Sequence, residues 1–203
     1  MIETAALISA FVTLFVIIDP IGLAPMFIAL TRGMTAAQRR SIAIRGSLVG
    51  AFLLTLFGLS GESILVAIGI TMPAFQIAGG ILLFLTALDM LFERRTPRRA
   101  GHAEAVPDPS IFPLAMPFIA GPGAMASMVL LVGQTQDWVG VLAIHVVMFA
   151  VLLIAFLLFL VATPLERALG PTGTMVVTRL LGMLLAALSV QFVLNGAQAA
   201  GVI

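Results

Sequence analysis

The sequence predicts an all-α integral membrane protein of six transmembrane helices, which form two inverted three-helix repeats. Three observations lead to this fold class. Hydrophobic residues make up 61% of the 203 residues and charged residues only 9%, and the mean hydropathy is +1.20, more than a water-soluble domain can cover with polar surface. Charge-poor stretches are long enough to cross a bilayer. All basic residues fall in or beside alternate connections between those stretches.

Six stretches reach the roughly 20 apolar residues that a helix needs to cross a hydrocarbon core. The first is interrupted only by Asp19, the second contains Glu62 and the third contains Asp89. The fourth follows a polar connection, and the sixth follows a turn at 170–174 that contains Pro and Gly. The predicted spans are Thr4–Thr31, Gly46–Ile70, Met72–Phe92, Ile111–Gly133, Val139–Thr163 and Val176–Ala199.

The arginines predict the orientation of the chain. Short connections rich in Arg or Lys stay on the cytoplasmic side, so we expect a multi-pass protein of the cell inner (plasma) membrane with both termini extracytoplasmic. The charged and proline-containing connection Glu93–Pro109 is expected to be mobile. The ten arginines are Arg32, Arg39, Arg40 and Arg45 between spans one and two, Arg94, Arg95, Arg98 and Arg99 between spans three and four, and Arg167 and Arg179, which flank the loop between spans five and six.

The composition excludes several classes of function. A net charge of +1, with arginines confined to short connections, does not form a nucleic-acid-binding surface. The chain has no cysteine for a thiolate metal site, no lysine for a P-loop, and no HExxH motif. We therefore expect no cofactor, no metal and no enzymatic activity. The sequence leaves the oligomeric state open, a homo-oligomer included.

The chain divides into two halves of three spans each, and an odd number of spans inverts the second half relative to the first. One offset of 102 residues aligns two separate segments, because it pairs Pro20 with Pro122 and Gly80 with Gly182. The alternative is coincidence between apolar segments. We predict a single transmembrane domain, 1–203, made of repeat one (about 1–92), a cytoplasmic linker (about 93–110) and repeat two (about 111–203).

Each repeat contains a proline break near the middle of its first span, at Asp19–Pro25 in span one and at Pro117–Gly123 in span four. Proline removes an amide donor and clashes with the preceding turn, whereas Asp or Gly followed by Pro favours the start of a new helix. We therefore predict that each span consists of two half-helices, whose partly positive N-termini face one another near the midplane, as in secondary transporters. The alternative is a pair of kinks that only shape packing.

Four motifs, in chain order, give the sequence a family resemblance. They are Asp19-Pro20-Ile21-Gly22 with Pro25, then Gln76 to Phe84, then Pro113 to Pro117 running into Ala120 to Gly123, and finally Thr178 to Gly182 with Asn195-Gly196. Together they cover nearly the whole chain and resemble the MarC family of six-span inner-membrane proteins. The resemblance implies kinship with LysE-type amino-acid exporters and transport of neutral amino acids such as glycine and alanine. It implies fold and topology more directly than it implies the substrate.

The breaks and the resemblance together predict a secondary transporter that moves a small zwitterionic solute through the lipid bilayer by alternating access. Free amides at the half-helix N-termini bind the solute's carboxylate, and Gly121 and Gly123 leave room for it. Asp19 binds the ammonium group, unless its carboxylate is occupied as a helix cap. Import or export, and coupling to protons or sodium, stay open. The predicted substrate-binding residues are Asp19, Pro20, Gly22, Pro25, Ala120, Gly121, Pro122 and Gly123.

Four polar residues outside the breaks are candidates for a gate or a pathway. Asp89 ends span three and Arg179 begins span six at the same membrane face, so the two suit an ion pair that closes the cytoplasmic end. Snorkelling to the interface explains Arg179 as well. Gln191 and Asn195 lie four residues apart and share one helical face. Hydrogen bonding between helices explains them as well as a pathway does.

A second class of function is an intramembrane serine protease. Gly58-Leu59-Ser60-Gly61 matches the GxSG nucleophile pattern of rhomboid proteases, and His145 on another span is a candidate base. Against this alternative, Ser60 lies towards the outer end of span two instead of at the start of a helix. A membrane protein with no transport role is the third alternative.

Overall fold

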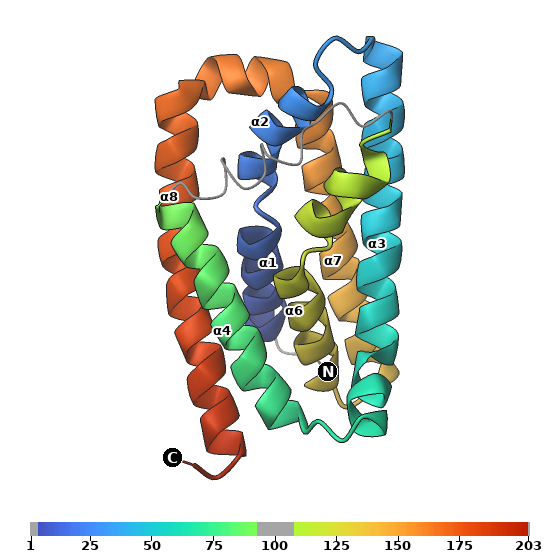
Figure 1. Ribbon diagram of the computed structural model, residues 1–203. Coiled ribbons are helices and arrows are strands. Elements are labelled where there is room, and N and C mark those ends of the chain that lie inside the picture. Colours follow the sequence, from blue (N-terminus) through green and yellow to red (C-terminus); the bar gives the residue numbers. More distant parts are fainter. Residues whose placement is uncertain (1–3, 93–107, 203) are drawn as a thin grey trace.

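The computed structural model describes residues 4–92 and 108–202, and all of the regular secondary structure in these ranges is helical (Figure 1). The π-wound element η1 and the helix that follows it form one bent unit. The elements are α1 (Thr4–Ile18), α2 (Pro20–Leu30), α3 (Ala36–Ala67), α4 (Met72–Leu91), η1 (Ser110–Ile119), α6 (Pro122–Gly133), α7 (Trp138–Leu160) and α8 (Ala162–Ala199).

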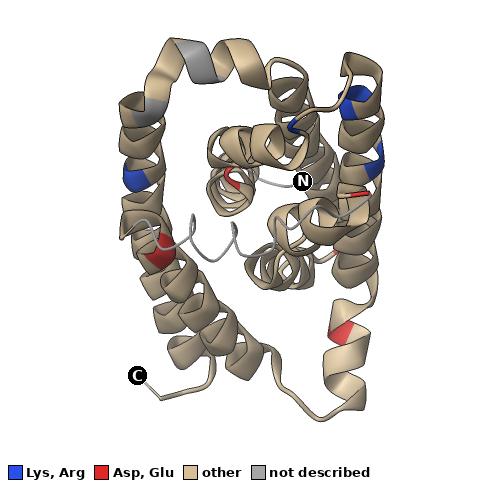
Figure 2. Cartoon of the chain, turned by 45° about the horizontal axis from the view of Figure 1, so that its top comes forward, with Lys and Arg blue, Asp and Glu red and all other residues tan. Residues whose placement is uncertain are grey.

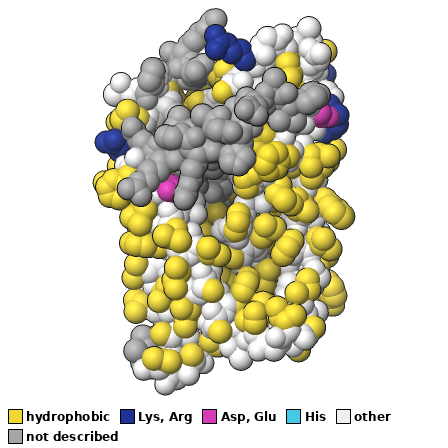
Figure 3. Space-filling model, in the orientation of Figure 1, with side chains coloured by type: hydrophobic (Ala, Val, Ile, Leu, Met, Phe, Trp, Pro, Cys, Tyr) yellow, Lys and Arg dark blue, Asp and Glu magenta, His cyan; other side chains and the backbone are white. Residues whose placement is uncertain are grey.

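Five segments of the described chain are long and apolar enough to cross a membrane, with α1 and α2 taken as one span. The bent pair of η1 and α6, which turns by 55°, brings the number to six when it is taken as one broken span. Apolar side chains are spread over the lower part of the face seen in Figure 3, as a surface in contact with hydrocarbon requires. The predicted all-α membrane architecture is therefore confirmed.

Successive spans run in opposite directions through the bundle, and the N and C labels lie at the same end, here called the termini end (Figure 1). The described basic residues lie toward the opposite end, here called the arginine end (Figures 2 and 3). This separation agrees with the predicted one-sided charge. Four of the arginines, Arg94, Arg95, Arg98 and Arg99, and most of the predicted linker lie outside the described residues.

The second span begins ten residues earlier than predicted. α3 starts at Ala36 instead of Gly46, because the two residues around its first turn form a capping box. The Thr35 hydroxyl accepts the Gln38 amide (3.3 Å), and the Gln38 side chain accepts the Thr35 amide (2.8 Å). Three arginines that were expected in a loop therefore lie on the first turns of α3.

The sixth span also begins earlier than predicted, at Thr172 instead of Val176. The expected turn at 170–174 is a single kink at Gly170, whose φ of 61° suits a residue without a Cβ. The chain between α7 and this kink crosses the arginine end of the bundle (Figure 1). Arg179 consequently lies inside the last span and not at its start.

Close helix approach in this bundle depends on glycines at the interfaces. A Cβ at Gly46 would lie 2.6 Å from Leu114, and one at Gly50 would lie 2.5 Å from Ile119, so α3 touches η1 where only glycine fits. α4 and α8 approach in the same way, since a Cβ at Gly80 would lie 2.8 Å from the Ser189 carbonyl oxygen. The contacts of Gly46 and Gly50 hold the broken fourth span against the unbroken helix α3.

The two broken spans resemble one another in how the first half ends and how the second half begins. In each span the first half ends at the break. The second half then begins with proline, Pro20 in α2 and Pro122 in α6. They run in opposite directions through the bundle (Figure 1). These features agree with the offset of 102 residues, and the inverted repeat itself stays a prediction.

Candidate functional site

The break in the first span consists of one residue, Asp19, in the left-handed conformation with φ 52° and ψ 61°. Its side chain is fully buried and caps α2, because Oδ1 accepts the amide of Gly22 at 3.0 Å. A Cβ at Gly22 would overlap this carboxylate, so the cap requires glycine there. Pro20 and Pro25 both lie inside α2, and the break is narrower than the predicted segment Asp19–Pro25.

The break in the fourth span lies at Ala120 and Gly121, between η1 and α6. Gly121 is the N-cap residue of α6 in extended conformation, and no side chain caps this helix. Pro122 at the first position has no amide, so the next two amides, those of Gly123 and Ala124, form the uncapped N-terminus of α6. The residues at these two positions are buried. An uncapped helix N-terminus at this depth is a site for negative charge.

The segment before this break, η1, is not a regular α-helix, although a helix was predicted for the first half of span four. η1 has π-type hydrogen bonds such as Ala120 N–H to the Ala115 carbonyl (2.8 Å), and Phe112 and Met116 have non-helical backbone angles. Each of these two residues precedes a proline, a position from which the α conformation is disfavoured. The spacing of Pro113 and Pro117 therefore explains the irregular winding.

The two breaks lie beside each other inside the bundle. A Cβ at Gly123 would lie 3.6 Å from Ile17 Cγ2 on the last turn of α1, and 2.9 Å from Leu83 Cδ2 on α4. A Cβ at Gly121 would lie 2.6 Å from the Pro117 carbonyl oxygen. The space next to both glycines is thus filled in this conformation. Protein atoms therefore pack where a side chain would be at either position, and the expectation that the two glycines leave room for a solute stays a prediction.

Sequence reasoning missed a buried hydroxyl below the second break. Ser127 lies one turn beyond Gly123 on α6, is fully buried, and its Oγ has no hydrogen-bond partner in the described chain. On α1, Thr13 is buried one turn before Ile17, the residue that lies next to Gly123. A serine in an apolar span gives no periodic signal, so only the three-dimensional packing reveals that Ser127 follows the uncapped helix end.

The predicted gate residues lie on neighbouring helices. Asp89 is on the last turns of α4, and Arg179 is on α8 about one turn from Gly182, where a Cβ would lie 3.0 Å from Met90 Cβ. Both side chains have interaction partners within the structure. Their pairing with each other stays a prediction, and their positions bring them to the same region of the arginine end.

The predicted pathway residues Gln191 and Asn195 bond to each other along α8. The Gln191 Nε2 donates to Asn195 Oδ1 at 2.7 Å, and Gln191 is exposed on the bundle surface. The spacing of four residues correctly placed them on one face. The structure joins them within one helix, and this hydrogen bond is neither a contact between helices nor a contact with the breaks.

Ser60 and His145 do not form a nucleophile–base pair in this structure. The Ser60 hydroxyl donates to the Leu56 carbonyl one turn earlier in α3. His145 Nδ1 bonds to the Val141 carbonyl at 2.8 Å, and its Nε2 has no hydrogen-bond partner in the described chain. The hydrogen bond between hydroxyl and imidazole that activates a serine is therefore not formed.

Arg39 links three elements at the arginine end, a role that the sequence did not indicate. Its Nε donates to the carbonyl of Thr31 at the end of α2, and its Nη1 donates to Thr163 Oγ1 at the start of α8, both at 3.3 Å. The half-helix after the first break is thereby held at both ends, by Asp19 at its start and by Arg39 at its close.

The entry to η1 is held by an exposed ion pair. Arg45 Nη1 lies 2.6 Å from Asp108 Oδ2, and the Ser110 amide donates to Asp108 Oδ1 at 3.1 Å. Hydrogen bonding from Ser110, and to a smaller extent the charge of Arg45, lowers the pKa of the Asp108 carboxyl below its ordinary value. Both side chains are about half exposed, so the pair is a surface interaction.

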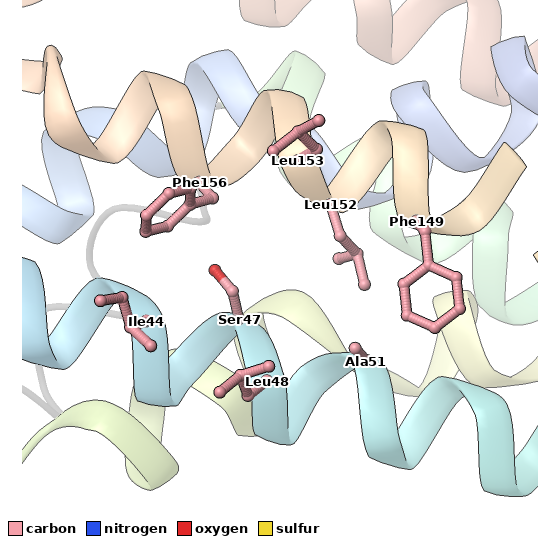
Figure 4. Close-up of a pocket in the computed structure, with 8 residues that line it drawn as sticks. All are labelled: Ile44, Ser47, Leu48, Ala51, Phe149, Leu152, Leu153 and Phe156. Atoms are coloured by element: carbon pink, nitrogen blue, oxygen red, sulfur yellow. The ribbon is translucent and has the colours of Figure 1, made fainter. Parts of the chain in front are cut away.

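An apolar groove of about 500 Å³ lies between α3 and α7 (Figure 4). Ser47 is the one lining residue with a polar side chain, and the other lining side chains are aliphatic or aromatic. Such a lining suits hydrocarbon, since it offers no charge to a zwitterion. The groove therefore does not suit a zwitterion, and the solute site at the breaks stays a prediction.

The fold and the site define a class of protein: a polytopic helical membrane protein in which two of the spans are broken and resume with a half-helix that begins with proline. Comparison with known proteins makes the class specific. Residues 4–200 match the family described as MarC family integral membrane protein, and the chain belongs to this family.

Relatives of the chain come from bacteria and archaea. The chain is 35% identical to a UPF0056 membrane protein of Aquifex aeolicus over 93% of this chain and 91% of the relative. It is 36% identical to a UPF0056 membrane protein of Archaeoglobus fulgidus over 93% of this chain and 90% of the relative. It is 34% identical to the UPF0056 inner membrane protein YhgN of Escherichia coli K12 over 94% of this chain and 95% of the relative. No solved structure matches the chain.

Proposed function

We propose that this protein is a secondary transporter of small neutral amino acids, of the glycine and alanine class, and that it works by alternating access. The observation that carries the proposal is the uncapped N-terminus of α6, buried beside the capped break at Asp19. An uncapped helix end inside a membrane protein selects an anion, and a buried carboxylate next to it selects a cation. A zwitterion supplies both.

In this proposal the solute's carboxylate accepts the amides of Gly123 and Ala124. These donors need no cationic side chain, because aligned peptide dipoles and free N–H groups bind a carboxylate directly. Ser127 offers a further hydroxyl on the same helix. The small space around Gly121 and Gly123 favours solutes with small side chains, since protein atoms already pack next to both glycines.

Asp19 supplies the negative charge for the ammonium group. A carboxylate accepts more than one hydrogen bond, so capping Gly22 and binding an ammonium are compatible. The remaining predicted binding residues, Pro20, Gly22 and Pro25, act by shaping α2 and its cap. They are positioning residues, since their side chains offer no donor or acceptor.

Alternating access requires the closed site to open toward each membrane face in turn. α4 fills the space next to Gly123 through Leu83, so in this proposal access begins when α4 moves away from α6 together with α8. Asp89 and Arg179 lie on these two helices at the arginine end and belong to the gate there. Two inverted halves that exchange conformations provide such a movement.

The same proposal covers orientation and location. The arginine end faces the cytoplasm and both termini face outward, in an inner membrane like that of the Escherichia coli relative. The protein acts without a cofactor and without enzymatic chemistry. Its partners are the solute and the lipid bilayer, with a homo-oligomer as a further assembly state.

Uptake into proteoliposomes tests the proposal. Purified protein is reconstituted and assayed with labelled glycine, alanine, leucine, glutamate and lysine, under imposed proton and sodium gradients. We expect saturable uptake of glycine and alanine, reduced at least tenfold in Asp19→Asn, which retains a capping side chain and removes the charge. Native protein that moves none of the five amino acids would refute the transport proposal.

A matched substitution separates the site from general damage. Gly173→Ala adds a methyl group in α8, away from the breaks, at 3.3 Å from Leu169 of the same helix. We expect this variant to transport normally. Uptake that survives Asp19→Asn unchanged would show that the solute binds elsewhere.

A further inference from the structure

The outer face of α8 carries a line of exposed side chains that no helix of the described chain covers. α8 lies at the edge of the bundle, and its inner face packs on α4 (Figure 1). The exposed side chains follow one another at alternating spacings of four and three residues, and the line is here called the α8 seam. A repeat of 3.5 residues keeps a seam turned toward a second helix that crosses at a shallow angle. The seam consists of Leu180, Leu184, Ala187, Gln191, Leu194 and Gln198.

The seam carries an amide where α8 crosses the hydrocarbon. The membrane-crossing part of α8, Thr172–Ala199, has 28 residues, so it is about 42 Å long and exceeds the ~30 Å hydrocarbon core. When this part is centred on the core, about 6 Å of helix extends beyond the core at each end. Gln191 is eight residues before Ala199, which places it about 12 Å from that end and therefore inside the core.

This amide retains unused donor and acceptor capacity. Gln191 Nε2 donates one hydrogen to Asn195 Oδ1 at 2.7 Å. Its second hydrogen, its Oε1 and Asn195 Nδ2 have no partner within the described chain. Lipid chains offer no hydrogen bond, and side chains on α8 lean toward its N-terminus, away from the nearer membrane surface. An exposed amide at this depth therefore indicates a partner that supplies hydrogen bonds within the membrane.

A second copy of this chain is the partner that fits the seam. Two copies inserted with the same topology are related by a two-fold axis along the membrane normal, which brings each seam residue opposite its own counterpart. A primary amide suits this arrangement, because it both donates and accepts, so two Gln191 side chains satisfy each other. A polar residue in an otherwise apolar seam also fixes the register of a helix dimer. Ala187, one turn away, lets the two backbones approach closely.

We propose that α8 is the interface of a parallel homodimer, in which the α8 seams of two copies pack together and the two Gln191 side chains hydrogen-bond to each other. Leu184 and Leu194, on either side of the amide pair, pack against their counterparts. The seam lies on the side of α8 away from α4, so each copy keeps its two breaks within its own bundle. The dimer goes beyond the transport proposal, which leaves the assembly state open, and it does not depend on transport.

Disulfide cross-linking in membranes tests the interface, because the chain has no cysteine of its own. Single cysteines replace Leu184, Ala187 or Leu194, and the full-length protein in lipid vesicles is oxidised with copper phenanthroline. We expect covalent dimers at all three positions, since cysteines on facing seams come within the Cα separation of about 4–7 Å that a disulfide spans.

Two exposed positions serve as matched controls. Val190 is exposed and adjacent to Gln191, but lies about 100° around the helix from it. Val146 is exposed on α7 and lies eight residues after the first residue of that helix, Trp138, at a depth that matches Gln191. Neither Val190→Cys nor Val146→Cys is expected to form dimers. Cross-linking of Val146→Cys as efficient as that of Leu184→Cys, or no cross-linking at the seam, would overturn the proposal.

Association in lipid tests the amide pair. Protein labelled with donor and acceptor fluorophores at Val202→Cys is reconstituted at decreasing protein-to-lipid ratios, and energy transfer gives the dimer fraction. We expect Gln191→Leu to weaken the dimer about 3- to 30-fold, the range for interhelical side-chain hydrogen bonds in membranes. Gln191→Asn, which retains an amide, is expected to weaken it less, and Val146→Leu is expected to leave it unchanged.

The dimer and the transport proposal fail separately. A Gln191→Leu protein that associates as tightly as native protein would overturn the dimer proposal, as would native protein that stays monomeric at every ratio. Cross-linking and energy transfer measure assembly alone, so these results leave the transport proposal in place. Protein that forms the dimer and moves no amino acid refutes transport alone.

Discussion

In both broken spans the second half-helix begins with proline. The two spans differ in whether a side chain caps the free amides at the start of that helix. In the first, the buried carboxylate of Asp19 caps α2 through the amide of Gly22. In the second, Gly121 provides no side-chain cap, and the N-terminus of α6 stays open. Each helix has proline at its first position, so the difference comes from one residue, the one before that proline.

This difference assigns different work to the two breaks. A helix end that a side chain has already capped is electrostatically satisfied, and it contributes a fixed negative charge to its surroundings. A helix end without a cap retains free donors for a ligand. In the proposed transporter, these similar backbone elements supply the positive and the negative end of one site for a zwitterion.

The largest effect is expected from removal of the cap at the first break. Asp19→Ala loses the capping oxygen and the local side-chain hydrogen bond that lets Asp and Asn adopt the left-handed conformation, whereas Asp19→Asn retains both. Both substitutions remove the charge. We expect the Ala variant to be less stable than the Asn variant by about 2 kcal/mol, from about 1 kcal/mol for the cap and about 1 kcal/mol for the backbone.

Thermal unfolding in detergent measures this difference. Variants of equal stability would show that the Asp19 side chain does not cap α2 in the membrane-extracted protein, and the contrast between the two breaks would lose its basis.

An artificial cap at the second break sharpens the comparison. Gly121→Ser and Gly121→Ala both add a Cβ next to the Pro117 carbonyl, and only serine adds an oxygen that accepts the free amides of α6. We expect the Ser variant to be more stable than the Ala variant by about 1 kcal/mol and to transport less.

If the Ser variant is more stable than the Ala variant and takes up less substrate, the added cap and the substrate compete for the same α6 amides. Unfolding temperature and alanine uptake are measured on both variants. Serine and alanine variants with equal uptake would show that the α6 amides do not bind the substrate.

A smaller effect is expected where the half-helix of the first break ends. Arg39→Ala removes the hydrogen bonds to Thr31 and Thr163 and is expected to cost about 1 kcal/mol, since each bond is long and partly exposed. Arg40→Ala, at an exposed neighbouring position, serves as the control and is expected to change stability by less than about 0.5 kcal/mol. Equal stability of the two variants contradicts the role of Arg39.

The smallest effect is expected at the exposed entry to the second broken span. The pKa of Asp108 is lowered in the folded state, so its contribution is full above its ordinary value of about 3.9 and is lost as pH falls through the lowered value. Asp108→Asn is expected to destabilise the protein by less than about 0.5 kcal/mol at pH 7, because solvent screens the pair with Arg45. Unfolding measured at pH 7 and pH 3 checks this. A larger loss at pH 3 than at pH 7 would contradict it.

The sequence predicted the coarse fold because membrane spans follow from length and apolarity. It also predicted both breaks, since Asp or Gly followed by Pro inside an apolar span favours the start of a new helix. The start of α3 was misplaced because arginines were treated as loop residues. A helix end at the interface accommodates arginine, whose long side chain reaches polar surroundings.

The packing of the candidate site could not be predicted from the sequence. Gly123 looked like open space, and in the fold Ile17 and Leu83, which are distant in sequence, pack next to it. Ser127 and Arg39 gave no periodic or motif signal, because their importance comes from what the bundle brings next to them. The cap at Asp19 was foreseen as an alternative, and only the hydrogen bond from the Gly22 amide decides that the side chain caps α2.

The most direct test of the account is a distance between the bound substrate and the uncapped helix end. Protein labelled with ¹⁵N at glycine is reconstituted with alanine labelled with ¹³C at the carboxyl, and dipolar recoupling NMR detects glycine nitrogens near that carbon. The account predicts one recoupled signal, from Gly123, at about 4 Å or less, as expected for a hydrogen-bonded carboxylate. Gly123→Ala removes that signal. Saturable alanine binding without any recoupled glycine nitrogen would contradict the account.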